Sequence, residues 1–274
     1  MEPIYFTKTS IGYAHLKSGK LCQDFSAAYH DGERTIVTAC DGHGGRLYLR
    51  SHLGSKFASD AIVQVFSALN PCDFRRYAKK GIAEKLRLQI LCAWNGMVER
   101  SYGKSPLRRK ECRLLSEQES VQLRLNAAKA YGTTLNGAMV LDGKVICASL
   151  GDGGVFLLRG GALLPAFPES DEEETVANIT HSMCQEDAYN HLKTAVFSCA
   201  EIDGVLLCTD GVINPYRNLA NFNESFVQPV VALAREERFK EIEAFVVRLG
   251  EEIGIGDDVS LGLILNERRT KEKA

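Results

Sequence analysis

The spacing of apolar residues changes twice along this chain, from a period of two to a period of about four and back to two. Early β-prone runs occupy residues 9–14, 25–29 and 35–40, and Asp31-Gly32 is a typical hairpin turn between the last two. Apolar residues then recur every four positions from Leu49 to Leu69 and again over residues 83–97. This spacing predicts two long amphipathic helices.

The period returns to two after Tyr131, which predicts three strands up to about residue 159. Further strands are expected over residues 194–199, 204–209 and 259–265, and two helices over residues 227–235 and 240–249. The polar segment 105–129 is expected to be helical in part. Strands and helices are thus segregated, which indicates an α+β fold rather than regular βαβ alternation. We expect a single domain over residues 1–274, with a charged, frayed tail at 266–274.

Composition excludes several classes of protein. An apolar fraction of 45% and a charged fraction of 25% are ordinary for a globular protein, and a net charge of -2 gives no reason to expect nucleic acid or an acidic membrane as partner. No apolar run reaches the length of a membrane span, and the N-terminus does not resemble a signal peptide. The nine cysteines form no Cys-x-x-Cys pair, and Cys147, Cys199 and Cys208 lie in apolar runs. We therefore expect reduced, buried thiols in a cytoplasmic protein.

Aspartates stand at the termini of predicted strands. Asp41 and Asp210 directly follow strands, whereas Asp24 and the pair Asp257-Asp258 directly precede them. In antiparallel neighbours the end of one strand lies beside the start of the next, so these residues are expected to meet at one rim.

Carboxylates gathered in this way repel one another unless something neutralises them, and oxygen ligands suit Mg²⁺ or Mn²⁺. Gly42 and Gly211 would let an ion approach the backbone. Any single Asp-Gly pair is more often only a turn, but the shared placement favours a metal site. The sequence contains no P-loop, HExxH, GxSxG or EF-hand spacing that would point to other chemistry.

Six short motifs occur in order: CQD at 22–24, CDGHGG at 40–45, YGTTL at 131–135, LGDGG at 150–154, CTDGV at 208–212 and GDDVS at 256–260. Together they resemble the metal-dependent protein phosphatase 2C family of Ser/Thr phosphatases, and most closely its bacterial branch. The resemblance implies a β-sandwich of two antiparallel sheets flanked by pairs of helices. It also implies a centre of two Mn²⁺ or Mg²⁺ ions at one end of the sandwich.

The resemblance assigns roles to individual residues. The carboxylate ligands of the two ions are matched by Asp24, Asp41, Asp210 and Asp257, with Asp41 as the bridging ligand. Gly42 matches a residue that ligates through its carbonyl group. Asp152 matches a ligand of a weaker third ion, and His43 matches the proposed general acid. A histidine that only orients water or caps a turn is the alternative for His43.

The chain departs from the family pattern at several positions. Gln23 stands where many relatives have Glu, and Gly153-Gly154 where they often have Ser-Arg. Asn214 replaces an aspartate that helps to hold the third ion in animal enzymes, which puts that ion in doubt here.

The arginine that binds the substrate phosphate in many relatives falls near Gly19. Lys20 or Lys17 is a candidate substitute, and Arg46 is another, although an arginine at the surface is the simpler interpretation of Arg46.

The resemblance implies a protein-serine/threonine phosphatase in which a water activated by two ions attacks the phosphoryl group. Its partner would be a phosphoprotein substrate, with a Ser/Thr kinase acting in opposition. Two alternatives stay open: a pseudophosphatase that binds a phosphoprotein or kinase without turnover, and a hydrolase of another ester such as a phosphodiester. The intact aspartates disfavour the first alternative, and the charge balance disfavours a nucleic-acid substrate.

Overall fold

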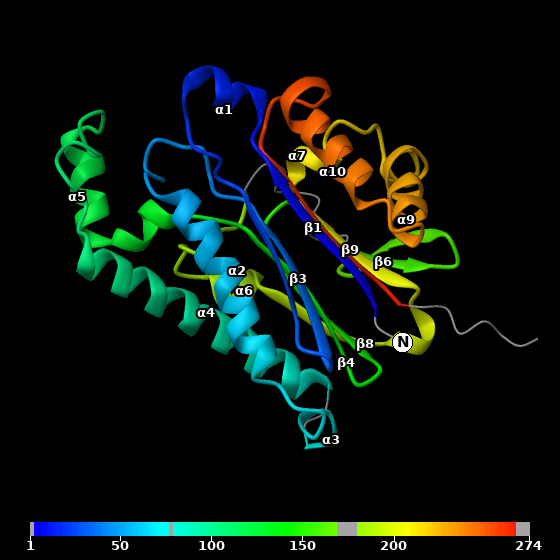
Figure 1. The fold of residues 1–274 in the computed structure, drawn as a ribbon. Coiled ribbons are helices and arrows are strands. Elements are labelled where there is room, and N and C mark those ends of the chain that lie inside the picture. The colour runs from blue at the N-terminus through cyan, green and yellow to red at the C-terminus, as the bar shows by residue number, and fades with distance from the viewer. Residues whose placement is uncertain (1–2, 77–78, 169–179, 267–274) are drawn as a thin grey trace, which may run out of the picture.

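The computed structural model describes residues 3–76, 79–168 and 180–266. Within these residues ten strands form two antiparallel sheets of five strands each, packed face to face as a sandwich (Figure 1). The first sheet has the order β1 (Ile4–Ser10), β10 (Val259–Leu265), β9 (Gly204–Cys208), β6 (Gly154–Arg159) and β7 (Ala162–Pro165). The second has the order β2 (Phe25–His30), β3 (Arg34–Cys40), β4 (Leu135–Leu141), β5 (Lys144–Leu150) and β8 (Lys193–Ser198).

Two pairs of helices cover the outer faces of the sandwich (Figure 1). The second sheet is covered by α2 (Ser51–Ser67) and α4 (Lys79–Lys104), and the first by α9 (Gln228–Arg235) and α10 (Phe239–Arg248). Shorter helices are α1 (Tyr13–Ser18), α3 (Asp73–Arg76), α5 (Glu117–Leu125), α6 (Ala188–His191), α7 (Asp210–Ile213) and α8 (Leu219–Phe222). None of the described helices is long and apolar enough to cross a bilayer.

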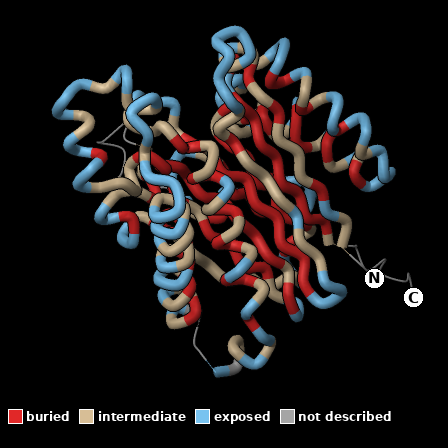
Figure 2. The backbone as a smooth tube through the Cα atoms, turned by 60° about the vertical axis from the view of Figure 1, so that its left-hand side comes forward, coloured by how far each residue is buried: buried red, intermediate tan, exposed pale blue. Residues whose placement is uncertain are grey.

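The core has one apolar layer between the two sheets and others between the sheets and the helices, and β3 contributes side chains to two of these layers. All seven residues of this strand are buried. Ile36 and Cys40 pack into the cluster beneath the helices, whereas Val37 and Ala39 pack into the cluster between the sheets. Successive side chains of a strand point to opposite faces, so a central strand covered on both sides must be apolar on both. Figure 2 shows the buried strands at the centre of the molecule and the exposed outer faces of the helices.

The predicted α+β sandwich of two antiparallel sheets is confirmed, and so are most of its elements. The strand expected over residues 9–14 is wrong in its bounds. Here β1 is displaced towards the N-terminus, because it pairs with β10 from Ile4 opposite Leu265 to Ser10 opposite Val259. Residues 13–18 form α1 instead. The sequence also gave no indication of β7, a strand of four residues.

The expectation of buried thiols is correct only in part. Cys40, Cys147 and Cys208 are buried, but Cys72 and Cys92 are exposed on the helical layer. All nine cysteines are free thiols. The acidic run at 171–174 and residues 267–274 of the expected frayed tail lie outside the described residues.

Candidate metal centre

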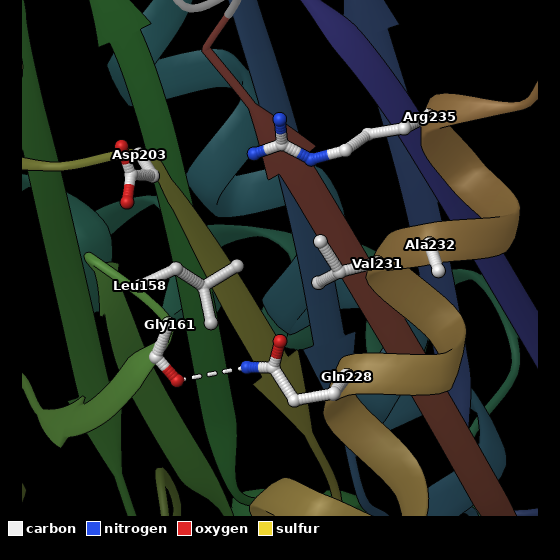
Figure 3. A pocket seen from close by; sticks show the side chains of 7 residues that line it. All are labelled: Leu158, Gly161, Asp203, Gln228, Val231, Ala232 and Arg235. Atoms are coloured by element: carbon white, nitrogen blue, oxygen red, sulfur yellow. Dashed lines mark hydrogen bonds between the residues drawn. The ribbon is translucent and has the colours of Figure 1, made fainter.

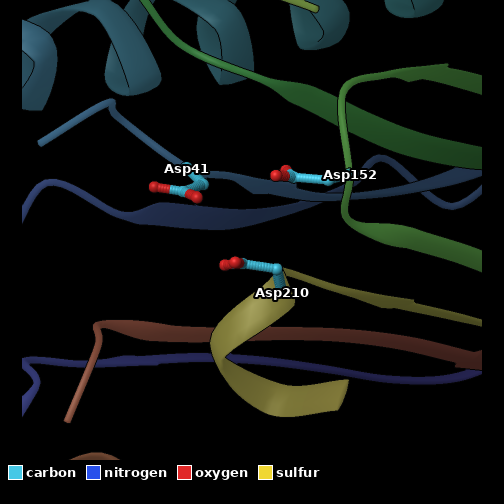
Figure 4. Close-up of side chains that lie close together, drawn as sticks. All are labelled: Asp41, Asp152 and Asp210. Atoms are coloured by element: carbon cyan, nitrogen blue, oxygen red, sulfur yellow. The ribbon is translucent and has the colours of Figure 1, made fainter. Parts of the chain in front are cut away.

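Three aspartates converge at one end of the sandwich. Asp41 directly follows β3, Asp152 lies in the loop between β5 and β6, and Asp210 begins α7 just after β9. Each offers a carboxylate oxygen, and these oxygens lie within 4.8 Å of one another. Figure 4 shows the three side chains approaching one another from separate segments. Antiparallel pairing of β2 with β3 and of β9 with β10 places Asp24 beside Asp41 and Asp257 beside Asp210 at this end. The two strand-end aspartates, Asp41 and Asp210, come from different sheets and meet because the sheets pack face to face, and Asp152 joins them.

Asp24 completes the interior of the cluster. It is buried, and the carboxyl groups of Asp24 and Asp41 act on each other's pKa. Thr209 Oγ1 donates a hydrogen bond of 2.8 Å to Asp24 Oδ2, whereas Asp24 Oδ1 is buried without a hydrogen-bond partner. Burial raises the pKa of Asp24 to about 8, and the nearby charge of Asp258 adds to the rise.

The pKa values of the other carboxyl groups in the cluster are also raised. Burial, followed by the charges of Asp24 and Asp210, raises the pKa of Asp41 well above its usual range. Burial and the charge of Asp152 raise the pKa of Asp210 to about 6. The pKa of Asp257 is raised as well, chiefly by burial, and its charge acts on Asp41 and Asp210. The five aspartates therefore form one interacting group of negative charge.

This group fits a hard divalent cation. Its donors are carboxylate oxygens, which Mg²⁺ and Mn²⁺ prefer. An unpartnered buried oxygen such as Asp24 Oδ1 is costly unless a ligand satisfies it. A cation would also offset the burial and the mutual repulsion that together raise the pKa values of these carboxyl groups.

Cys40, the cysteine that precedes Asp41, is not a candidate catalytic nucleophile. Burial raises the pKa of the Cys40 thiol to about 12, so the thiol stays protonated at neutral pH. A protonated, buried thiol is not a nucleophile.

Two threonines fix the backbone of Asp41. Thr134 N donates to Asp41 O at 2.7 Å, and Asp41 N donates to Thr134 Oγ1 at 3.0 Å. Thr133 Oγ1 also donates to Asp41 O, at 2.8 Å. No role for either threonine was predicted from the sequence. Their presence in the YGTTL motif, beside an aspartate at a strand end, was the only indication of one.

The adjacent residues Asp257 and Asp258 have different surroundings. Asp258 is buried and accepts hydrogen bonds from Gly12 N at 2.7 Å and Gln23 N at 2.6 Å. Its side chain also contacts His15 Nδ1 at 2.9 Å. Asp258 therefore holds the N-terminal loop that leads to Asp24, whereas Asp257 contributes charge to the cluster. The sequence placed both at the strand start and did not separate their roles.

Gly42 lies where no side chain fits. A Cβ atom there would lie 2.6 Å from Gln23 O and 2.7 Å from Ser51 O, both of them backbone atoms. Gly42 also bridges to Thr133 and donates its N–H to Gln23 O at 3.1 Å. The glycine after Asp41 is thus required by close approach of the backbone, as well as being a candidate carbonyl ligand.

His43 lies beside the cluster. Its ring packs edge-on against Tyr48, with 4.9 Å between the ring centroids, and Gln23 Nε2 donates to His43 O at 3.1 Å. Burial lowers the pKa of His43, and the charge of Asp152 opposes this shift. The imidazole is therefore close enough to the carboxylates to sense them electrostatically.

The candidate phosphate-binding residues are less close to the cluster. Arg46 is exposed, and its guanidinium group donates to Leu114 O and lies 3.4 Å from Glu119. Lys20 is exposed on the loop after α1. Neither side chain has a described contact with a cluster aspartate, and their roles in binding phosphate stay predictions.

Asn214, which departs from the family pattern, does contact the cluster. Its Nδ2 donates to Asp210 Oδ2 at 3.1 Å. A neutral amide thus orients one carboxylate at a position where an aspartate would add charge.

A separate hollow lies between the β6–β7 turn and α9, and Figure 3 shows the side chains that line it. It is lined by Leu158 and Gly161 near the β6–β7 turn and by Gln228 and Arg235 of α9. Asp152 precedes β6 whereas Gly161 follows it, so this hollow is not part of the acidic site.

Comparison with known protein families shows to which family the chain belongs. The family model described as protein phosphatase 2C matches residues 11–246. The chain belongs to the protein phosphatase 2C family. The family places it among the protein-serine/threonine phosphatases, as the six motifs indicated. A search of curated proteins found no match.

Solved structures with the phosphatase 2C fold resemble the whole chain. A bacterial serine phosphatase is 16% identical, with 97% of this chain and 98% of that chain covered and a TM-score of 0.63. The Mycobacterium tuberculosis serine/threonine phosphatase PstP/Ppp is 15% identical, covering 98% and 100%, with a TM-score of 0.58. The catalytic domain of PstP in complex with two manganese ions is 15% identical, covering 96% and 98%, with a TM-score of 0.58. At these identities the likeness concerns the fold.

Proposed function

We propose that this phosphatase 2C protein hydrolyses phosphoserine and phosphothreonine in proteins with the help of two divalent ions, Mn²⁺ or Mg²⁺. The proposed carboxylate ligands are Asp24, Asp41, Asp210 and Asp257, and Gly42 would add its carbonyl oxygen. The observation that carries the proposal is the convergence of Asp41, Asp152 and Asp210 within 4.8 Å, beside a buried Asp24 oxygen that has no partner. The manganese ions described for the PstP catalytic domain support it.

Bound divalent ions supply two effects, since they lower the pKa of water and neutralise charge on phosphoryl oxygens. The residues of the chain do the rest. Asp41, held by Thr133 and Thr134, keeps its carboxylate in a fixed place. Asp152 would be a ligand of a weaker third ion, beside Asp210 and Asn214.

His43 is the proposed general acid. The alkoxide that leaves a phosphoserine needs a proton, and an imidazolium beside the cluster can donate one. The charge of Asp152 favours the protonated ring against the effect of burial. Lys20 and Arg46 are the proposed contacts for the substrate phosphate. The protein would act in the cytoplasm on a phosphoprotein, in opposition to a Ser/Thr kinase.

Hydrolysis of a phosphothreonine peptide and of an aryl phosphate tests the proposal, each measured with Mn²⁺, with Mg²⁺ and with chelator. Both substrates should release phosphate only with added ion. Binding of the peptide without release of phosphate would favour the pseudophosphatase alternative. Hydrolysis of a phosphodiester in preference to both would favour the third class of function.

A further inference from the structure

A short basic segment, residues 104–113, stands out against the weakly negative charge of the chain as a whole. It contains a single acidic residue, Glu111. Its basic residues, all exposed, are Lys104, Arg108, Arg109, Lys110 and Arg113. The net charge of the whole chain is only -2, so positive charge is concentrated here. A local concentration of this kind steers ligands of the opposite charge.

The basic segment is held by one buried arginine. Arg50 is only 5% exposed, and it donates to Ser105 O at 2.6 Å and to Pro106 O at 3.2 Å. It also pairs with both carboxylate oxygens of Glu111, at 2.8 and 3.0 Å. Two parallel bonds of this kind fix geometry as well as charge. Tyr131 accepts a further bond from Arg50 at 2.8 Å.

This anchoring leaves the outer face of the segment positive. The carboxylate of Glu111 is engaged by Arg50 and by Arg108 N, which donates to it at 2.9 Å. Within the described residues, no ion pair involves Arg109, Lys110 or Arg113. The segment is therefore pre-organised, and a partner would bind it without first having to order the backbone.

The same anchors place the basic segment at the rim of the acidic site. Arg50 contacts Tyr131, which lies directly before the Gly132-Thr133-Thr134 stretch that holds Asp41. Arg46, five residues after Asp41, donates to Leu114 O just beyond the segment. Figure 1 shows α5, which follows the segment, at the same end of the sandwich as α1 and α7. Asp210 begins α7, so the segment and the acidic site share that end.

We infer that the basic segment docks acidic residues that flank the phosphorylated serine or threonine of a protein substrate. The inference rests on the proposed function and names the class of substrate that the site prefers. An acidic peptide is favoured over nucleic acid because this basic segment is short and the chain is negative overall. The segment adjoins a site whose family acts on phosphoproteins, which supplies the phosphorylated residue.

A matched pair of substrates and a matched pair of variants test the inference. The substrates are two phosphothreonine peptides that differ only in having four flanking aspartates or four flanking asparagines. The segment variant combines R109Q, K110Q and R113Q. The control variant combines R159Q, R235Q and K240Q, which removes the same charge from exposed positions on β6, α9 and α10. Fluorescence polarisation reports binding of non-hydrolysable phosphonate analogues, and phosphate release reports turnover separately.

The parent should bind the acidic peptide about tenfold more tightly than the neutral one, at low ionic strength. The segment variant should lose this preference and the control variant should keep it, with hydrolysis of aryl phosphate unchanged in both. Equal affinity of the parent for the two peptides would overturn the inference, as would an equal loss in both variants. A segment variant that lost binding to anionic vesicles or single-stranded DNA, but kept the peptide preference, would overturn it too.

A failure of the proposed phosphatase function would give a different result from a failure of the docking inference. In that case the parent would prefer the acidic peptide but release no phosphate from any substrate. The docking surface would then stand without the catalytic function.

Discussion

Asp41 and Thr134 are joined by two hydrogen bonds that run in opposite directions, one from each backbone N–H group. Thr134 directly precedes β4, so the residue that follows β3 is fixed by the start of the neighbouring strand. The position of the central aspartate is thus set by strand pairing and not by its own loop. Removal of the Thr134 hydroxyl group therefore tests whether this contact fixes the position of Asp41.

Replacement of Thr134 by valine should weaken both the fold and the site. Valine removes the acceptor for Asp41 N and leaves a buried N–H group unpaired, which costs about 1–3 kcal/mol of the free energy of unfolding. T134S keeps the hydroxyl group and is the matched control. Urea unfolding and phosphate release measured on both variants check this. A T134V variant that is no more affected than T134S would show that the hydroxyl group does not fix Asp41.

Stability without metal should fall as pH rises. The unfolded chain releases aspartate protons near pH 4. The folded chain holds them longer, because the pKa is about 8 for Asp24 and about 6 for Asp210. The folded state therefore binds more protons in this range, and the free energy of unfolding decreases from about pH 4 to about pH 8. Urea unfolding in chelator measures this decrease.

Added Mn²⁺ should reverse that trend, because the ion replaces the protons and stabilises only the folded state. Its stabilising effect should grow with pH over the same range. D24N removes the carboxyl group with the pKa of about 8 and should flatten the decrease seen in chelator. A free energy of unfolding in chelator that does not change with pH would mean that folding does not raise the pKa values of these carboxyl groups.

Gly42 and Gly44 differ in the space around them, although they belong to the same motif. A Cβ atom at Gly42 would lie 2.6 Å from a backbone oxygen, whereas at Gly44 the nearest atom is the side chain of Gln23 at 3.6 Å. We expect G42A to lower phosphate release by roughly 10²-fold, because a shift of about 1 Å in a site costs that much. G44A should behave as the parent. Comparable losses in both variants would show that the loop needs glycine for flexibility rather than for space.

Loss of His43 should depend on the leaving group. As general acid its removal costs roughly 10²- to 10⁴-fold for an alkyl phosphate such as phosphoserine. An aryl phosphate has a leaving group that is stable without a proton, so H43Q should slow its hydrolysis far less. Steady-state rates on a phosphopeptide and on an aryl phosphate give the comparison. An equal loss on both substrates would assign His43 to orienting water.

The sequence predicted the parts of the molecule that repeat a simple pattern. The β-prone run of β3, the four-residue spacing of α2 and the Asp31-Gly32 turn between β2 and β3 are local features, and the structure confirms them. The placing of Asp24 beside Asp41 and of Asp257 beside Asp210 followed from strand order, whereas the two pairs meet because the sheets pack face to face. Antiparallel pairing leaves few other places for the end of one strand and the start of the next.

The parts that the sequence did not predict depend on contacts between distant segments. The bounds of β1 are set by its pairing with β10 at the other end of the chain. The two neighbours Asp257 and Asp258 are distinguished only by the N-terminal loop that binds Asp258. The basic segment looked like a polar connection, because its anchor Arg50 is 55 residues away from Ser105 in the chain.

Mn²⁺ binding and phosphate release, measured on the same preparation by titration calorimetry and with a phosphothreonine peptide, test the central claim most directly. The parent should bind the ion and release phosphate, and exhaustive chelation should abolish both. D41N and D210N should each lower phosphate release by roughly 10³-fold and weaken ion binding while the protein remains folded, since each removes a charge that holds the ions. Phosphate release that survives chelation, or a near-normal rate in a folded D41N variant, would contradict the account.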